Sequence, residues 1–243
     1  MYGDDLAYIH DVGFSDYVLR AAPGILRTLA GSGVRRGLVV DLGCGGGRWA
    51  HVLNDRGYDV LGVDLSPQFV KMARAHAPRS KFVAADVWTF RPPPCDAVTS
   101  VGEVLNYGRR HLLGGFFRRM FRALRPGGVF VFDLAGPDRT SPGGKRRVWA
   151  AGEDWAVLSE SAGDRKKLLR TIISFRKSGR HYRRSEEIHE VQLYEPKEVL
   201  NALEAAGFET RAVSAFGAFQ LPVGICGYVA EKGGSASRQK RAT

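Results

Sequence analysis

Apolar residues along the chain follow two spacings that alternate from one segment to the next. Short apolar runs, bounded by glycine, proline or polar residues, predict strands near 37–41, 59–63, 81–85, 95–101 and 128–133. Between them, apolar residues at helical spacing predict helices near 46–56, 67–76 and 109–124. Strands that alternate with helices in this way are typical of a doubly wound α/β fold with a mostly parallel sheet.

The segments before and after this region add further elements. A helix is expected over 15–30, with Ser15 as its N-cap and the Pro23-Gly24 pair as a point where it kinks or splits. The preceding residues, 8–14, are aromatic and show no regular spacing. The pattern closes with a helix over 196–206, followed by Gly207 as its C-cap, and with strands over 208–213 and 225–230.

The spacing of apolar residues changes between the fifth predicted strand and the last predicted helix. Residues 145–194 show no helical spacing and predict three extended pieces, near 147–158, 167–177 and 181–194, with Gly179 at a hairpin turn. We therefore expect an antiparallel β insert that lies above the carboxyl edge of the main sheet.

A glycine-rich loop follows the first predicted strand. Residues 39–49 read VVDLGCGGGRW, which contains the pattern D-x-G-x-G-x-G. Glycines let the backbone turn sharply and let a ligand approach closely. A G-x-G pattern alone is weak evidence, because several nucleotide cofactors use it. Here Asp41 stands at the strand tip, where its charge would repel a pyrophosphate and attract the sulfonium and amino groups of S-adenosylmethionine.

Three later segments reinforce this motif. Asp64 ends the second strand at the spacing of a ribose-binding carboxylate, Asp86 ends the third strand, and 124–133 read LRPGGVFVFD. In this order the four segments resemble the Rossmann-like (class I) methyltransferases that use S-adenosylmethionine. The resemblance covers 39–133 and implies S-adenosyl-L-methionine as cofactor, with contacts from Asp41, Gly43, Gly45, Asp64, Leu65, Asp86, Val87 and Gly102.

The same resemblance sets expectations for the rest of the chain. In this family the Asp86 position reaches the adenine amine, and the backbone of Val87 meets the ring. The last two strands form an antiparallel hairpin at the edge of a seven-stranded sheet. The resemblance therefore implies a methyltransferase domain over 1–231, in which 145–194 forms a lid over the acceptor.

Methyl transfer is a direct displacement, so the protein must chiefly align two reactants and exclude water. The segment 100–107, which passes beside the methionine part of the cofactor in this family, supplies the first candidates. Glu103 either accepts a proton or binds a cationic acceptor, or it only accepts hydrogen bonds from loop amides. Tyr107 either walls the acceptor pocket or packs in the core.

The last piece of the insert supplies the second group of candidates. Period-two alternation places one set of side chains on a single face: Glu187, His189, Val191 and Leu193. The apolar pair indicates that this face is covered. His189 is then either a base near neutral pH or a core histidine held by a carboxylate, and Glu187 lines the same cavity. We expect Tyr8 and His10 at the entrance.

Composition limits where the protein can be located and which kinds of site it can contain. The chain has 243 residues with no apolar run as long as a membrane span, and its first residues lack the cationic and apolar pattern of a secretory signal, so we expect none. Cys44, Cys95 and Cys226 form neither a disulfide framework nor a zinc pattern, and no carboxylate–histidine cluster predicts a metal. These features predict a cytoplasmic protein. Residues 232–243 are small, polar and basic, and predict a disordered tail.

The formal charge of +11 leaves the acceptor open. Between 145 and 185, twelve Lys and Arg residues face four acids, without the regular aromatic interleaving that binds single strands. We expect methyl transfer to an oxygen or nitrogen of a small molecule. The alternatives are an RNA or protein methyltransferase that uses the basic insert, and a cofactor-binding regulator without catalysis. The sequence does not determine the oligomeric state.

Overall fold

The computed structural model describes residues 2–139 and 144–234 and contains a seven-stranded sheet in the order β10-β13-β5-β4-β1-β2-β3. Its strands are β1 (Gly37–Leu42), β2 (Tyr58–Asp64), β3 (Lys81–Ala84), β4 (Cys95–Ser100), β5 (Leu124–Ala135), β10 (Glu209–Val213) and β13 (Ile225–Glu231). Strand β13 is antiparallel to β5 and to β10, and the other pairs are parallel. The predicted doubly wound sheet with an antiparallel edge is confirmed.

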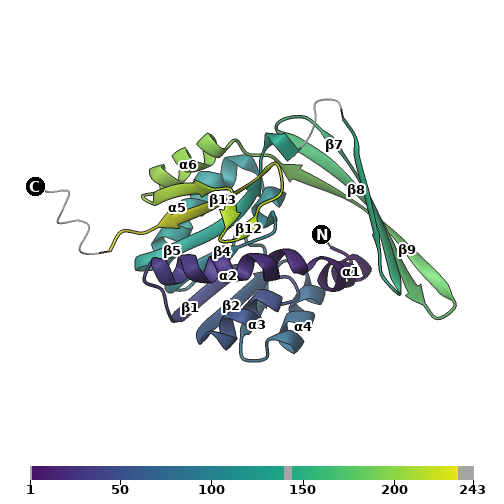
Figure 1. Cartoon of the computed structure of the whole chain (residues 1–243), viewed down its shortest axis with the longest axis horizontal. Helices are drawn as coiled ribbons and strands as arrows, with labels where there is room; N and C mark the ends of the chain where they lie inside the picture. The colour runs from purple at the N-terminus through teal and green to yellow at the C-terminus, as the bar shows by residue number, and fades with distance from the viewer. Residues whose placement is uncertain (1, 140–143, 235–243) are drawn as a thin grey trace, which may run out of the picture.

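Helices cover both faces of this sheet (Figure 1). They are α1 (Asp4–Phe14), α2 (Asp16–Gly31), α3 (Arg48–Asp55), α4 (Pro67–His76), α5 (Leu113–Ala123) and α6 (Pro196–Ala205). One core joins α2, α3 and α4 to the sheet, and Leu29 and Trp49 are buried there. The other joins α5 and α6, with Phe117 and Leu203. Burial on both faces explains why the strands read as continuous apolar runs.

The strand order places a ligand site. After β1 the chain builds β2 and β3 on one side, and then crosses to build β4 on the other side of β1. In open α/β sheets ligands bind at such a reversal, outside the carboxyl ends of the strands. The predicted glycine loop follows β1 directly and therefore lies at this point.

The insert is a separate four-stranded antiparallel sheet that projects beyond the carboxyl edge (Figure 1). It contains β6 (Arg146–Ala151), β7 (Trp155–Gly163), β8 (Lys167–Ser178) and β9 (His181–Gln192), paired in that order. Gly179 forms the β8–β9 turn with φ of 62°, as predicted. The prediction of three pieces was wrong, because Gly152 begins a turn that divides the first piece: its N–H donates to Trp155 O at 2.9 Å.

The helix predicted over 15–30 is confirmed as α2, but residues 8–14, which showed no regular spacing, belong to α1. Ser15 stands at the N-cap position of α2, but its side chain does not cap this helix, because its hydroxyl donates back to Asp11 O at 2.6 Å. Pro23 lies inside an unbroken α2, whose buried apolar face outweighs the hydrogen bond lost at proline. The helix expected from 109 begins at Leu113, since 104–107 and 110–112 form 3₁₀ turns.

The C-terminal end differs from the expected tail at its first residue. Lys232 is anchored by its amino group, which donates to Phe121 O at 2.7 Å and to Leu124 O at 2.6 Å. From 235 onward the predicted tail lies outside the described residues. Within 2–139 and 144–234, no helix is long and apolar enough to cross a membrane.

Candidate active site

A cavity of about 1020 Å³ opens at the carboxyl ends of β1, β2 and β4, where the insert and α1 close over it. Two groups of residues line it. The first, here called the loop side, comes from the main sheet and contains Asp41, Gly43, Gly45, Asp64, Leu65, Asp86, Val87 and Gly102. The second, the insert side, includes Tyr2, His10, Tyr107, Arg146, Ser161, Arg170 and His189. All eight residues predicted for the cofactor therefore lie on one side of one cavity.

The glycine loop lets a ligand meet the backbone. Gly43 has φ of +74°, and a Cβ there would lie 2.4 Å from the Val104 side chain. Gly45 has φ of +51°, and a Cβ there would meet nothing within 4 Å. The loop is fixed from below, since Gly43 N–H donates to Val63 O at 2.7 Å. Glycine is required at Gly43 by packing, while Gly45 leaves open space beside the cavity.

Asp64 is held rigidly at the tip of β2. Its two carboxylate oxygens accept hydrogen bonds from Gly45 N–H at 3.0 Å and from Ser66 N–H at 2.9 Å. Ser66 in turn caps α4, as predicted, by accepting from Phe69 N–H at 3.4 Å. Burial raises the pKa of Asp64, and these backbone donors oppose that rise. The carboxylate is thereby oriented toward the cavity before any ligand arrives.

Asp41 is buried without a cation beside it. Its carboxylate accepts a hydrogen bond from the Thr99 hydroxyl at 2.8 Å, and no ion pair to it is found among the described residues. Desolvation raises the pKa of Asp41 to about 7. A buried carboxylate without a counter-charge is unfavourable, and a sulfonium or ammonium group in the cavity would relieve this. The loop side therefore fits S-adenosylmethionine.

Asp86, Val87 and Leu65 complete the loop side. Asp86 accepts a hydrogen bond from Trp88 N–H at 2.8 Å, which holds its carboxylate at the end of the loop after β3. Val87 is buried, and Leu65 is 47% exposed beside Asp64. Two apolar side chains and one carboxylate at the cavity wall suit a flat ring that carries an amine.

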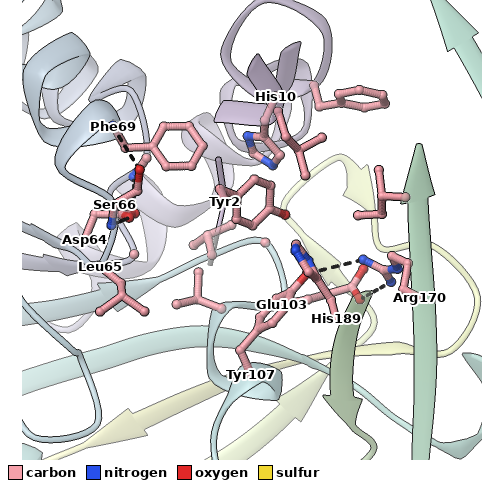
Figure 2. Close-up of a pocket in the computed structure, with 18 of the residues that line it drawn as sticks. Tyr2, His10, Asp64, Leu65, Ser66, Phe69, Glu103, Tyr107, Arg170 and His189 are labelled. Carbon is pink, nitrogen blue, oxygen red and sulfur yellow. Dashed lines mark hydrogen bonds and ion pairs between the residues drawn. The ribbon is translucent and has the colours of Figure 1, made fainter. Parts of the chain in front are cut away.

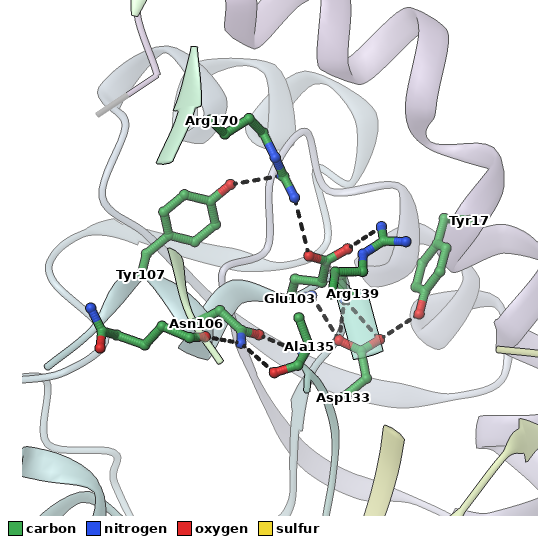
Figure 3. A network of polar contacts seen from close by, with 10 residues as sticks. Tyr17, Glu103, Asn106, Tyr107, Asp133, Ala135, Arg139 and Arg170 are labelled. Atoms are coloured by element: carbon green, nitrogen blue, oxygen red, sulfur yellow. Dashed lines mark hydrogen bonds and ion pairs between the residues drawn. The ribbon is translucent and has the colours of Figure 1, made fainter. Parts of the chain in front are cut away.

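The turn after β4 is strained and held by a buried acid (Figure 3). Glu103 has φ of 62°, the left-handed region that non-glycine residues rarely adopt. The N–H groups of Gly102 and Glu103 donate to Asp133 at 3.0 and 2.7 Å, and the Tyr17 hydroxyl donates to Asp133 at 2.9 Å. Burial raises the pKa of Asp133 to about 6. These donors stabilise the ionised carboxylate and so hold the turn.

The Glu103 carboxylate lies between two guanidinium groups (Figure 3). Arg139 donates to it at 2.9 Å, and Arg170 from the insert at 3.4 Å. Within residues 2–139 and 144–234, no loop amide donates to this carboxylate, and its hydrogen-bond donors are the two guanidinium groups. Its roles as a proton acceptor or as a site for a cationic acceptor stay predictions.

His189 lies at the cavity with one nitrogen engaged and one unpaired. Its Nε2 contacts Glu187 Oε2 at 2.9 Å, and its buried Nδ1 has no partner in the described part of the chain. Desolvation lowers the pKa of His189, while Glu187 opposes this change. Glu187 does not line the cavity, contrary to expectation, and also accepts from Gly3 N–H at 3.0 Å. It therefore orients His189 from behind.

Of the other residues predicted to contact the acceptor, two line the cavity and one does not. His10 and Tyr107 line the cavity, and desolvation lowers the pKa of His10 to about 4. Tyr8 lies elsewhere: Arg176 stacks over its ring at 3.3 Å, and its hydroxyl donates to Asp154 at 3.4 Å. On the helix that 8–14 form, residues two apart face opposite directions, so Tyr8 and His10 do not reach the same surface.

Four residues of the insert side were missed in the sequence: Tyr2, Arg146, Ser161 and Arg170. The Tyr2 ring lies among those of His10, Phe69 and His189, with centroids 5.5, 5.5 and 5.1 Å away (Figure 2). No pattern marks Tyr2, because it precedes the first regular element. For Arg170 the sequence does contain a signal. It lies two residues from Leu168 and two from Ile172 along β8, so it shares the face of these buried residues, as His189 shares the face of Val191 along β9.

No metal site emerges from the part of the chain that the structure describes. There, no three His, Cys, Asp or Glu side chains are grouped so that they could hold an ion. Cys44, Cys95 and Cys226 are free thiols. The ionisable groups that line the cavity include carboxylates, guanidiniums and imidazoles.

Comparison with known proteins supports the same interpretation. Residues 39–128 match the model of a methyltransferase domain family. The chain is 33% identical over 140 residues to a trans-aconitate 2-methyltransferase of Rhodopseudomonas palustris (strain HaA2). The aligned region covers 56% of this chain and 53% of that protein, so the chain spans about half the length of this relative.

Solved structures show the same fold over nearly the whole chain. A S-adenosylmethionine-dependent methyltransferase from Clostridium acetobutylicum superposes with a TM-score of 0.81 at 20% identity, over 94% of this chain and 98% of that one. CalS10, an amino pentose methyltransferase from Micromonospora echinaspora with S-adenosylmethionine bound, superposes with a TM-score of 0.75 at 23% identity, over 96% of this chain and 98% of that one.

Fold and loop side together define a class of enzyme: a doubly wound sheet whose first glycine turn and strand-tip acids accept an adenosyl cofactor. The chain contains a methyltransferase domain over 39–128 and has the fold of the S-adenosylmethionine-dependent methyltransferases.

Proposed function

We propose that this enzyme transfers a methyl group to an oxygen or nitrogen atom of a small-molecule acceptor. The acceptor binds on the insert side of the cavity, between β8, β9 and the turn after β4. One observation carries this proposal: the loop side and the insert side face each other across a single cavity of about 1020 Å³. That volume is at the upper end of ordinary ligand pockets and has room for two small molecules together.

An enclosed cavity suits the reaction. S-adenosylmethionine supplies an electrophilic methyl group, and the protein must place the acceptor in line with it and keep water away. The insert and α1 close the cavity from above, as a lid would. Two relatives are named for small molecules, trans-aconitate and an amino pentose, which supports an acceptor of this size.

In this proposal His189 removes the proton of the acceptor. Its lowered pKa keeps the imidazole neutral at neutral pH, and its buried Nδ1, which has no partner in the described part of the chain, is then free to accept a proton. The proton of an O–H or N–H group moves to Nδ1 as the new bond to the methyl carbon forms. Glu187, on Nε2, then stabilises the imidazolium. Glu103 instead holds Arg170 and Arg139 in place.

The basic insert gives less support to a polyanionic acceptor. Arg165 forms an ion pair with Glu195 at 3.1 Å, and Lys167 forms one with Glu190 at 3.4 Å, so part of this charge is neutralised within the chain. The free thiols agree with a reducing compartment, and a cytoplasmic location remains our prediction.

A comparison of His189→Gln with His181→Gln tests this proposal. Both residues lie on β9, but His181 is exposed at the far end of the strand. Release of S-adenosylhomocysteine is measured over a panel of alcohols, carboxylates and amines. His189→Gln should lower kcat by about 10² to 10⁴, as expected for loss of a general base, with cofactor affinity unchanged. His181→Gln should match the wild type.

The pH profile separates a base from a packing role. Neutral His189 is the active form, so kcat falls as the pH drops through its pKa, which lies below 6.5. Because the Glu187 carboxylate raises that pKa, Glu187→Gln should move the acid limb to lower pH. Equal kcat in the wild type and His189→Gln would exclude the base, and turnover of none of the small acceptors would contradict the proposed acceptor class.

A further inference from the structure

The inner face of the insert sheet carries a continuous row of polar side chains. The strand register pairs Arg146 on β6 with Ser161 on β7, Ser161 with Arg170 on β8, and Arg170 with His189 on β9. Residues paired directly across antiparallel strands project from the same face of the sheet. All four line the cavity, so this row, here called the Arg146–His189 row, spans the whole insert and faces inward.

Apolar side chains lie on both sides of Arg170 in this row. The neighbouring row on one side contains Leu168 and Val191, which are buried, and the row on the other side contains Val148, Ser159, Ile172 and Glu187. The Arg170 side chain is 21% exposed, so an ionic contact to its guanidinium is stronger than on an open surface. Arg146, at the outer end of the row, is exposed.

The charges of the cavity are unevenly divided. The loop side carries the carboxylates of Asp41, Asp64 and Asp86. On the insert side, the carboxylate of Glu103 is shared by Arg139 and Arg170, and the Arg170 contact is the longer of the two at 3.4 Å. Glu190, which also lines the cavity, pairs with Lys167 at 3.4 Å. Arg146 forms no ion pair with any residue in the described ranges. Positive charge therefore exceeds negative charge where the acceptor would bind.

We propose that the Arg146–His189 row binds an anionic group of the acceptor, a carboxylate or a phosphate. This inference rests on the proposed function and names the acceptor's chemical class. Arg146 and Arg170 donate to the anion from either side, and the Ser161 hydroxyl donates from between them. Strands lie about 4.8 Å apart, so Ser161 and His189 are about 10 Å apart along the row. The anion and the methylated atom are then separate parts of one molecule.

Calorimetry on the protein saturated with S-adenosylhomocysteine tests this inference. Citrate probes carboxylate binding and uridine diphosphate probes phosphate binding, at constant ionic strength, with glycerol and uridine as uncharged counterparts. At least one anion should bind, and Arg146→Gln and Arg170→Gln should each weaken it by about tenfold or more. Arg147→Gln is the matched control, because Arg147 is the next residue on β6 and pairs with Glu160 at 2.6 Å.

The outcomes are distinct. Binding of citrate alone assigns a carboxylate, and binding of uridine diphosphate alone assigns a phosphate. If neither anion binds, if the uncharged probes bind equally well, or if Arg146→Gln retains wild-type affinity, the row does not bind an anion. Arg146 is exposed, so this variant should fold even if Arg170→Gln, which loses the Glu103 contact, does not. Methyl transfer to uncharged small acceptors alone would overturn the inference and leave the proposed function standing.

Discussion

Asp41 shows how a single residue ties stability to ligand binding. Its carboxylate is buried, accepts one hydrogen bond from Thr99, and has its pKa raised to about 7 by desolvation. Because the pKa in the folded protein lies above the ordinary value of 3.8, stability is lost as the pH rises from 3.8 through about 7. The unliganded protein therefore retains an unfavourable charge that a cationic ligand would compensate.

We expect cofactor affinity to rise with pH for this reason. Below about 7 the Asp41 carboxyl is neutral, and above it the carboxylate attracts the cationic groups of S-adenosylmethionine. Calorimetric titrations between pH 5.5 and 7.5 should show affinity increasing by up to about tenfold per unit below the pKa. Asp41→Asn is the control, because the nearby Asp64 and Cys44 remain. A variant with the same pH dependence as the wild type would exclude Asp41 as its source.

At the scale of elements, Asn106 joins the insert to the main sheet (Figure 3). This fully buried residue lies in the 3₁₀ turn over Val104–Tyr107. Its amide donates to the carbonyls of Ala135, at 3.0 Å, and Gln192, and it accepts from Ala135 N–H at 3.0 Å. The last residue of β5 and the last residue of β9 are thus held by one side chain, which fixes the position of the lid.

Replacing Asn106 by Ala should therefore destabilise the protein markedly. The Ala135 N–H would remain buried without this acceptor, and the Gln192 carbonyl would lose a donor, for a loss of about 2 to 3 kcal/mol in the free energy of unfolding. Urea denaturation measures this change. Asn201→Ala, on the exposed side of α6, should stay within about 0.5 kcal/mol of the wild type. Equal stability of the two variants would mean that Asn106 is not a structural joint.

Helices, strands and turns could be predicted from the sequence where adjacent residues determine their conformation. Ser66 and Pro67 mark the start of α4, and Gly179 marks the β8–β9 turn, because each conformation depends on a few adjacent residues. The turn after Gly152 was missed because apolar residues flank it on both sides. Helix α1 was missed because its apolar positions pack against the insert: Leu6 and Ile9 bury against Val157 and Ile172. Such contacts cannot be inferred from spacing.

At the scale of the whole molecule, the two sides of the cavity differ in how far they could be predicted. The loop side follows from strand tips and one glycine turn, which the parallel sheet brings to one edge by topology. The insert side depends on how a second sheet and α1 are placed over that edge. Tyr2 reaches the cavity only through this packing, so its position became visible in the structure alone, whereas Arg170 is marked by the apolar residues on either side of it along β8.

Because three distant parts of the chain line one cavity, binding of S-adenosylhomocysteine should protect all three from hydrogen exchange. A ligand at about 100 times its Kd adds about 2.7 kcal/mol against opening of the segments that hold it. Protection is expected in the glycine loop, in α1 beside His10, and around Arg170 in β8. Strands β10 and β13, at the opposite edge of the sheet, serve as the internal control. Protection confined to the glycine loop would show that α1 and the insert close only when the acceptor binds, because the cofactor would then act on the loop side alone.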